Sequence, residues 1–309
     1  MPGRCPGSAE TAASRAKHWR TGLGAASIVP MTTTAGEARA RVAGVFDQLA
    51  PAYDQGGVPW FRPMAARLVE ILEPRAGERA LDIGAGRGAA TFPLCEAVGP
   101  EGRVTAIDLS PVMADHLRDD AATRGVANLE VLVGEAGPET LETGAFDVVT
   151  ASLVLFFDPD PQATLRGWVS LVRPRGGRIG LATFGPIDDV WRRAELLVLE
   201  HAPEGLLDAR TAGVRGPFAT TETMAALLTD CGATSVDSHD EPLEVVLPDA
   251  AAWRAWTMTT GFREAWNSVP EAERESVLAK VSEVLEDNRG SDGQLHLTQQ
   301  VRYTSGRVD

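Results

Sequence analysis

The stretch Ala80-Leu-Asp-Ile-Gly-Ala-Gly-Arg-Gly88 decides the fold, because an apolar strand-like run passes directly into a glycine-rich turn. Glycine at such a turn lets the backbone take angles that other residues avoid and lets a ligand approach the main chain closely. Taken alone the pattern is ambiguous, since the spacing Gly84-x-Gly86-x-x-Ala89 also satisfies a relaxed dinucleotide-binding fingerprint and glycine-rich strand ends also form plain tight turns. The stretch therefore predicts a ligand site at the end of a strand.

Two acidic residues follow at the ends of the next two strand-like runs. The run Val104–Asp108 ends in a carboxylate that can accept hydrogen bonds from two ribose hydroxyls, and Val131–Val133 leads into Gly134-Glu135-Ala136. Acidic residues at solvated strand ends are common. Three strand ends in register are better explained by one ligand that binds along the carboxyl edge of a parallel sheet.

Short β-rich runs alternate with helical segments along most of the chain, which favours parallel strands covered by helices on both faces. The β-rich runs are 79–83, 103–108, 129–133, 146–151 and 178–183. Apolar residues at helical spacing cover 42–49 and 60–71 before the first of these runs. After residue 184 we expect a helical patch at 191–199, a helix at 221–230, a strand-like pair within 235–247, a helical insert from Trp253 and a final strand at 294–304.

Composition and charge exclude several classes of function. With 44% hydrophobic and 23% charged residues, the chain of 309 residues has the composition of a globular protein. The formal charge of -14 argues against a nucleic-acid partner, because such affinity comes largely from lysine and arginine. No run of about 18 apolar residues is present, so we expect no membrane span. A neutral or cationic small molecule fits the charge better.

The first residues differ from the rest of the chain. They are basic where the remainder is acidic, and they contain no continuous apolar segment of the kind a secretory signal needs. We expect residues 1–35 to be a disordered extension, or Met31 to be the natural start. The three cysteines are far apart and outside any metal-binding spacing, which indicates a reducing, cytoplasmic setting and no metal site.

Several further motifs carry a resemblance to a known family. They are Phe46-Asp47-Gln48-Leu49-Ala50 with Tyr53-Asp54, Phe146-Asp147-Val148-Val149, and Leu171-Val172-Arg173-Pro174 before Gly176-Gly177. Together with the glycine turn and the two acidic strand ends, they make residues 42–184 resemble class I S-adenosylmethionine-dependent methyltransferases. The similarity is closest to the branch that contains the ubiquinone and menaquinone biosynthesis enzymes and many small-molecule methyltransferases.

The resemblance implies a fold and a cofactor site. The fold would be a Rossmann-like three-layer α/β sandwich with a mostly parallel seven-stranded sheet, an antiparallel last strand and helical cap inserts. S-adenosylmethionine would be the cofactor, with Gly84, Gly86 and Gly88 along its methionine part and Asp82 near its amino group. Asp108 would hold the ribose, Glu135 and Ala136 would face the adenine, and Tyr53 would cover the cofactor. Ala85, Leu109, Met113, Gly134 and Ser152 complete the predicted cofactor-binding set.

Two departures from the family pattern concern recognition and catalysis. Many relatives carry aspartate where Glu135 stands, so the longer acid must reach the adenine differently or leave the contact to backbone atoms. Many also carry histidine after the fourth strand, where this chain reads Ser152-Leu-Val-Leu-Phe-Phe-Asp158. A general base adds only about 10²–10⁴-fold, whereas positioning contributes roughly 7–11 kcal/mol, so the missing histidine does not exclude methyl transfer.

Phe156 and His201 are the candidate catalytic residues. An aromatic face near the sulfonium would attract the positive charge and exclude water, and we expect one of Phe156 and Phe157 to do this while the other packs under the sheet. His201 lies in the insert that would cover the acceptor, although a lone histidine on a helix is more often a surface or packing residue. Trp191, Trp253, Trp256 and Trp266 in the two inserts suit either a hydrophobic acceptor or simple core packing.

We expect one methyltransferase domain over 36–309, with cap helices at 36–75, a cofactor-binding core at 76–184 and substrate-cap inserts at 185–220 and 248–290. The predicted reaction is methylation of O, N or C of a small, hydrophobic, secondary-metabolite-like or quinone-like molecule. Two alternatives stay open: a non-methylating cyclase or isomerase on the same scaffold, and a nicotinamide-dependent oxidoreductase. The sequence is also compatible with a homodimer.

Overall fold

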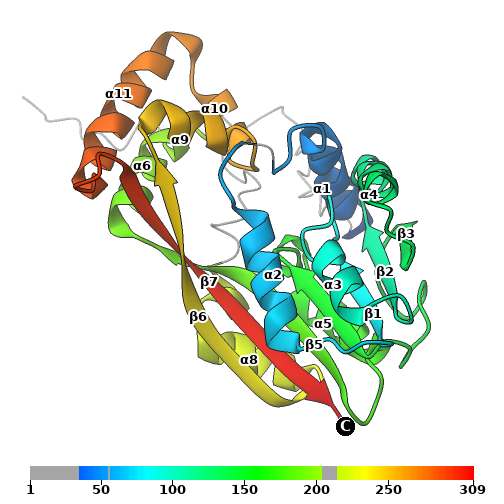
Figure 1. Ribbon diagram of the computed structural model, residues 1–309. Coiled ribbons are helices and arrows are strands. Elements are labelled where there is room, and N and C mark those ends of the chain that lie inside the picture. The colour runs from blue at the N-terminus through cyan, green and yellow to red at the C-terminus, as the bar shows by residue number, and fades with distance from the viewer. Residues whose placement is uncertain (1–34, 55, 204–213) are drawn as a thin grey trace, which may run out of the picture. The chain divides into compact units, whose positions relative to one another are not determined.

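A seven-stranded sheet with the order β3-β2-β1-β4-β5-β7-β6 forms the centre of the fold (Figure 1). The computed structural model describes residues 35–54, 56–203 and 214–309, so the expected N-terminal extension and the start at Met31 lie outside the described residues apart from residue 35. The strands are β1 (Arg79–Ile83), β2 (Arg103–Asp108), β3 (Leu129–Val133), β4 (Val148–Ser152), β5 (Gly177–Ile187), β6 (Thr234–Leu247) and β7 (Leu295–Val308). Strands β1 to β5 pair in parallel and β7 is antiparallel to both of its neighbours, which confirms the predicted fold class.

The outer strand β6 differs from the expected strand-like pair, because residues 234–247 form one continuous strand. It pairs with β7 along almost its whole length, and its residues alternate between more and less exposed positions without a turn. Pro242 lies within this strand and has no backbone N–H to donate. It is tolerated because β6 lies at the edge of the sheet, where a backbone position can face solvent instead of a neighbouring strand. The one irregularity lies between Thr234 and Asp237, where Ser235 takes a φ of 48°.

Helices cover both faces of the sheet. Those on one face are α2 (Phe61–Leu72), α3 (Thr91–Val98) and α4 (Pro111–Arg124), and those on the other are α5 (Pro161–Leu171) and α8 (Thr221–Asp230) (Figure 1). Both α4 and α5 begin with an N-cap, since the side chains of Ser110 and Asp160 accept hydrogen bonds from the backbone N–H groups of Met113 and Ala163. These helices bury the apolar faces of the strands and leave the carboxyl ends of the parallel strands open.

A group of helices gathers at one end of the long strand pair β6–β7 (Figure 1). Its members are α6 (Asp189–Leu199), α9 (Ala250–Thr257), α10 (Arg263–Ser268) and α11 (Arg274–Leu285), with the short turns η3 (Glu271–Glu273) and η4 (Glu286–Asn288). They fall within the predicted cap ranges 185–220 and 248–290. All four tryptophans of these helices are buried, so core packing, one of the two roles that the sequence suggests, accounts for the presence of most of them. None of the helices in the described part of the chain is both long enough and apolar enough to cross a membrane.

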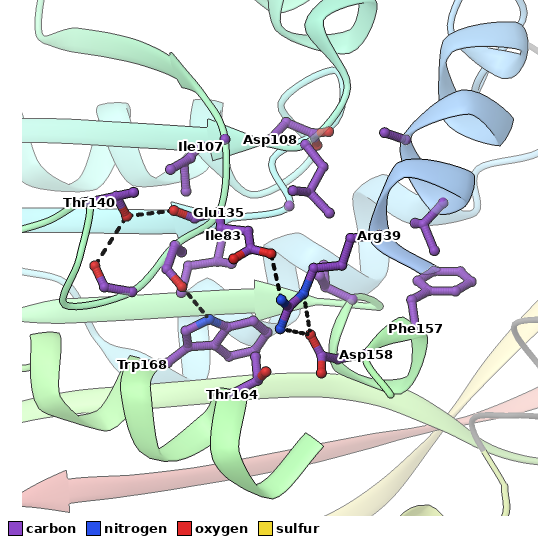
Figure 2. Close-up of a pocket in the computed structure, with 18 of the residues that line it drawn as sticks. Arg39, Ile83, Ile107, Asp108, Glu135, Thr140, Phe157, Asp158, Thr164 and Trp168 are labelled. Carbon is purple, nitrogen blue, oxygen red and sulfur yellow. Dashed lines mark hydrogen bonds and ion pairs between the residues drawn. The ribbon is translucent and has the colours of Figure 1, made fainter. Parts of the chain in front are cut away.

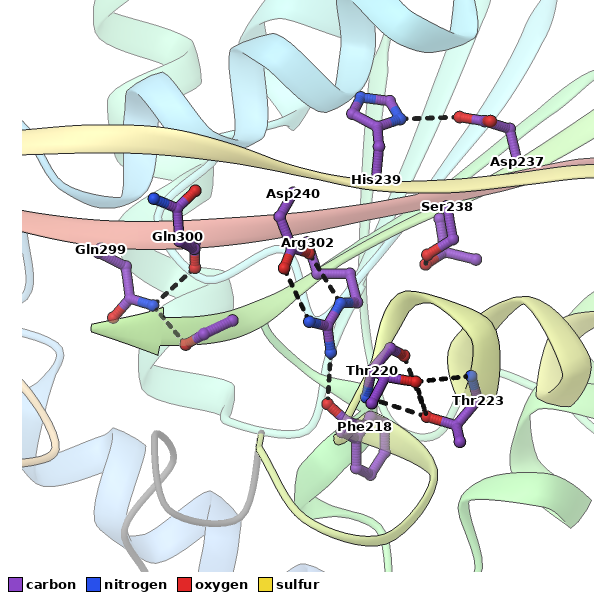
Figure 3. A network of polar contacts seen from close by, with 12 residues as sticks. Phe218, Thr220, Thr223, Asp237, Ser238, His239, Asp240, Gln299, Gln300 and Arg302 are labelled. Carbon is purple, nitrogen blue, oxygen red and sulfur yellow. Dashed lines mark hydrogen bonds and ion pairs between the residues drawn. The ribbon is translucent and has the colours of Figure 1, made fainter. Parts of the chain in front are cut away.

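A buried polar network ties strands β6 and β7 to the turn η2 (Gly216–Phe218) (Figure 3). Arg302 on β7 is only 3% exposed, and its guanidinium donates two hydrogen bonds of 2.8 Å to the carboxylate of Asp240 on β6. Its third contact is a 2.7 Å hydrogen bond to the backbone carbonyl of Phe218. Because a buried guanidinium needs such partners, the network fixes the position of Phe218, whose ring meets Phe156 edge-on at 6.2 Å between centroids.

Candidate functional site

The carboxyl ends of β1 and β4 border a cavity of about 440 Å³. The sheet order reverses between these two strands, because the chain runs outward from β1 to β3 on one side and from β4 on the other. Such switch points are where open α/β sheets bind ligands. The large cavity is lined by the glycine turn, by the loops after β2, β3 and β4, by α5, and by one face of α1 (Ala35–Leu49) (Figure 2).

The glycine turn approaches the cavity through backbone that only glycine takes easily. Gly84 and Gly86 have φ angles of 65° and 51°. A Cβ on Gly84 would collide with the side chain of Val154, whereas a Cβ on Gly86 would meet only the ring of Tyr53 at 3.8 Å and would otherwise point into open space. Gly84 is therefore required by packing, and Gly86 leaves room for a ligand.

Gly88, by contrast, does not border the cavities. A Cβ there would lie 2.6 Å from the ring of Phe92 on α3 and 2.7 Å from Leu117 on α4. The third glycine of the turn thus allows α3 and α4 to pack closely, and its predicted contact with the cofactor remains a prediction.

Asp108 is held at the end of β2 with its carboxylate toward the large cavity (Figure 2). One oxygen accepts a 2.7 Å hydrogen bond from Gly86 N–H and the other accepts a 2.8 Å bond from Ser110 N–H. Burial raises the pKa of Asp108, these two donors lower it, and the nearby charge of Asp47 raises it. Each oxygen keeps further acceptor capacity, so the carboxylate is fixed in place and still able to accept two hydroxyl donors.

Asp82 lies deeper, at the end of β1, beside a second cavity of about 50 Å³ that Ala85 and Arg87 also line. It accepts hydrogen bonds from the hydroxyls of Thr91 at 2.6 Å and Thr150 at 2.9 Å. Burial raises the pKa of Asp82 to about 6, although the two hydroxyls lower it. The carboxyl group therefore titrates close to neutral pH at the place where the sequence predicts the cofactor's amino group.

The other end of the large cavity is built around the loop after β3. Trp168 on α5 donates a 3.2 Å hydrogen bond from its indole N–H to the carbonyl of Ala136, and the hydroxyl of Thr140 donates to the carbonyl of Glu135 (Figure 2). The Glu135 carboxylate forms an ion pair with Arg39 of α1. This region offers a flat apolar wall with fixed backbone polar groups, which suits a nucleobase. Leu109, Met113 and Gly134 line the same cavity, and their contact with the cofactor remains a prediction.

A third cavity, of about 50 Å³, is bordered mainly by aromatic rings, and we call it the aromatic chamber. Its lining is Phe46, Tyr53, Trp60, Phe61, Leu153, Phe156, Phe157, Phe184, Trp256, Thr257, Thr260, Gly261 and Phe262. Tyr53 lines all three cavities, and Ser152 borders the two that adjoin the glycine turn. Burial, together with the charges of Asp54 and Asp108, raises the pKa of Tyr53 far above its usual value, so its phenol stays neutral.

The two candidate catalytic residues lie in different places. Phe156 borders the aromatic chamber and packs on Phe184 and Phe218, while Phe157 borders both the chamber and the large cavity. His201 is not among the described residues that line the three cavities, and its Nδ1 lies 4.0 Å from the carboxylate of Glu273. A catalytic role for either residue remains a prediction.

Sequence reasoning missed several residues of the site. Arg39, Asp158 and Trp168 line the large cavity, and Phe46 lines both the large cavity and the chamber. A signal for α1 was present, because Arg39, Val42, Ala43 and Phe46 repeat at helical spacing and all face the cavity. For Trp168 and Asp158 no signal in the sequence distinguishes a cavity residue from a packing or capping residue.

A glycine turn, a fixed carboxylate at the end of β2 and a wall that contains the Trp168 indole lie on one sheet edge, which is the arrangement expected of a nucleoside-binding site in a methyltransferase. Comparison with known proteins agrees. Residues 80–176 match the methyltransferase domain family. The chain is 36% identical to nocamycin O-methyltransferase of Saccharothrix syringae over 85% of this chain and 97% of that enzyme. It is 41% identical to aklanonic acid methyltransferase DauC of Streptomyces sp. strain C5 over 46% of this chain and 64% of that enzyme.

A solved structure with the same fold is the YcgJ protein of Bacillus subtilis, with a TM-score of 0.52 and 17% identity over 80% of this chain and 99% of that one. The chain therefore belongs to the S-adenosylmethionine-dependent methyltransferases that act on small molecules, as the sequence predicted. S-adenosylmethionine is its cofactor, and the residues present fit this molecule. The Asp108 carboxylate suits the ribose, the open Cα of Gly86 gives space, and a volume of about 440 Å³ is typical of a ligand pocket.

Proposed function

We propose that this enzyme transfers the methyl group to an oxygen that is already ionised at neutral pH, as in a carboxylate or the enolate of a β-dicarbonyl group. The acceptor is a hydrophobic small molecule whose reacting end binds in the aromatic chamber. S-adenosylmethionine supplies an electrophilic methyl group on a positively charged sulfur. The chain's own residues bind both reactants, align them and exclude water.

The observation that carries this proposal is the chemistry of the chamber lining. Among the described residues, the lining contains no Asp, Glu, His, Lys, Arg or Cys side chain. The Thr257 hydroxyl donates to the carbonyl of Trp253 at 2.9 Å, and the Thr260 hydroxyl donates to the carbonyl of Thr257 at 2.8 Å. With the pKa of Tyr53 raised, none of these groups can take a proton from an amine or an ordinary alcohol near neutral pH.

An anionic acceptor suits an apolar chamber beside a sulfonium. The attraction between unlike charges grows as the effective dielectric constant falls, so the reactants are drawn together. The transfer then cancels both charges, which a low-dielectric surrounding favours. Rate acceleration comes mainly from alignment, which can contribute roughly 7–11 kcal/mol without an acid or base.

The names of two relatives support an oxygen acceptor or an acidic acceptor, since one is an O-methyltransferase and the other is named for aklanonic acid. The chamber of about 50 Å³ holds only the reacting end of such an acceptor. The remainder of a larger molecule would have to extend from the chamber after movement of the surrounding aromatic side chains.

The test is to incubate the protein with methyl-labelled S-adenosylmethionine and an extract of the organism that produces it, and then to treat the labelled product chemically. A methyl ester releases its label as methanol in mild alkali, and an enol ether releases it in acid. We expect release by one of these treatments. Label that survives both would place the methyl group on nitrogen, on carbon or on the oxygen of a phenol or alcohol, and would contradict the proposal.

A further inference from the structure

Arg39 joins three separate segments at the mouth of the large cavity (Figure 2). Its Nη1 lies 2.8 Å from the Glu135 carboxylate, and its Nε and Nη2 each lie 3.1 Å from one oxygen of Asp158. Arg39 belongs to α1, Glu135 to the loop after β3, and Asp158 to the segment that follows the turn η1 (Leu155–Phe157). One guanidinium thus bridges the two walls of the cavity from the helix that lies along it.

The bridge is well placed to hold α1 over the cofactor. The face of α1 formed by Arg39, Val42, Ala43 and Phe46 lines the cavity, so this helix covers whatever is bound. Its C-terminal half is tied down elsewhere, because the Ser110 hydroxyl donates a 2.5 Å hydrogen bond to Asp47. The ion pairs of Arg39 join the N-terminal half of α1 to the loop after β3 and to the segment after η1.

The Asp158 carboxylate and the Glu135 backbone are themselves held in place. The second oxygen of Asp158 accepts a 2.9 Å hydrogen bond from Asp160 N–H at the start of α5, and the Asp158 side chain is only 11% exposed. The Glu135 backbone is held by the hydroxyl of Thr140. Movement of Arg39 would therefore move α1 and leave the two walls where they are.

We propose that Arg39 is a positioning residue that sets the rate at which the cofactor and its demethylated product leave the site. While both ion pairs of Arg39 are formed, they keep α1 over the nucleoside end of the cavity. The helix can move away from the cavity only after both ion pairs break. The bridge lies at the cofactor end, so this role is independent of the acceptor class proposed above.

The test compares Arg39→Gln with Arg41→Gln, a matched control because Arg41 is an exposed residue of the same helix. The first measurement is the release of S-adenosylhomocysteine, followed by stopped-flow tryptophan fluorescence, since Trp168 lines the cavity. The energy of one exposed ion pair corresponds to a change of up to about fivefold in an equilibrium or rate constant. Loss of the two ion pairs of Arg39 should therefore speed product release on the order of tenfold. Arg41→Gln should release the product at the wild-type rate.

Two further readouts separate positioning from general loss of structure. Salt screens ion pairs, so release from the wild type should become faster with ionic strength, and release from Arg39→Gln should not. In the cofactor-free protein, amide hydrogen exchange in residues 39–46 should be faster in Arg39→Gln than in Arg41→Gln.

Asp158→Asn provides an independent variant should Arg39→Gln fold poorly, and it should release the product faster than the wild type but less fast than Arg39→Gln, because the ion pair of Arg39 with Glu135 remains. Combining the two substitutions should add little beyond Arg39→Gln alone, because that substitution already removes both ion pairs. Equal release rates and equal exchange in Arg39→Gln, Asp158→Asn and Arg41→Gln would overturn the proposal. These measurements need no methyl acceptor, so their outcome tests the role of Arg39 and does not depend on whether the proposed reaction is correct.

Discussion

The ring of Tyr53 stacks on the ring of Phe61, with 4.5 Å between centroids and 13° between planes, at the place where the three cavities meet. The stack holds a neutral phenol between the glycine turn and the aromatic chamber. Tyr53 is thereby oriented by packing, and its hydroxyl can serve as a hydrogen-bond donor in the site.

Tyr53→Phe keeps the stack and removes only the hydroxyl. Because the pKa of Tyr53 is raised far above neutral, we expect the substitution to lower kcat by about tenfold or less while leaving the shape of the pH profile between pH 6 and 9 unchanged. Tyr53→Leu should cost more, since it removes the stack as well. Initial rates with the identified acceptor provide the measurement, and an ionisation in that pH range that disappears in Tyr53→Phe would show that the phenol acts as a base.

Gly84→Ala and Gly86→Ala should differ in kind. The new Cβ at residue 84 would collide with Val154, so we expect a loss of several kcal/mol of stability in urea unfolding, partly restored by the double change Gly84→Ala/Val154→Ala. At residue 86 the new methyl group meets open space, so we expect about 1–2 kcal/mol of backbone strain in a folded protein that binds the cofactor poorly. If titration calorimetry found normal cofactor affinity in folded Gly86→Ala, the ligand would not approach this turn.

Asp108→Asn should weaken S-adenosylmethionine binding at least 100-fold. The amide loses the charge that strengthens hydroxyl hydrogen bonds, each worth about 1.5–3 kcal/mol, and its NH₂ group faces the backbone N–H of either Gly86 or Ser110. Asp115→Asn on the exposed face of α4 is the control and should bind normally. Similar affinities in the two variants, measured by titration calorimetry, would place the ribose elsewhere.

Cofactor binding should also depend on pH through Asp82. Its pKa of about 6 means that the carboxylate becomes ionised as the pH rises from 5 to 7, so affinity for the cofactor's ammonium group should increase over this range. Asp82→Asn should bind more weakly at pH 7 and show a flatter profile. A wild-type affinity that is constant from pH 5 to 7.5 would argue against an ion pair between Asp82 and the ammonium group.

The raised pKa of Asp82 also affects the stability of the protein, which should fall with rising pH while the affinity for the cofactor rises. An acid whose pKa is higher in the folded state binds more protons there, so the cofactor-free protein loses stability as the pH rises from about 4 to about 6. For a shift of this size the Asp82 contribution is roughly 3 kcal/mol. Urea unfolding of wild type and Asp82→Asn across this range gives the difference directly.

The sequence predicted the sheet and the cofactor side of the site because both follow from local patterns. Asp82, Asp108 and Glu135 each stand at the end of a strand-like run, and the ends of parallel strands lie at one edge whatever the rest of the fold does. Arg39 could not be placed in this way. It meets Asp158 across 119 residues of chain, and only the packing of α1 brings the two together.

The assignment of Phe156 and Phe157 shows another limit of sequence patterns. Alternation along a strand predicts which of two neighbours faces the site, but β4 ends at Ser152 and Leu153 takes a φ of 61°. The following residues form the short turn η1, so the strand's alternation no longer applies to them. Both rings consequently border the chamber, and Phe157 also borders the large cavity.

Strand β7 follows β6 in the chain and yet lies between β6 and β5. During synthesis on the ribosome, β6 would therefore emerge before the strand that connects it to the sheet, and its edge would stay unpaired until the 14 residues of β7 arrive. The parallel strands β1 to β5 have no such dependence, since each finds its neighbour among residues already made. The cofactor-binding half can accordingly assemble first, whereas the Arg302 network that steadies Phe218 against Phe156 cannot form until β7 has been made.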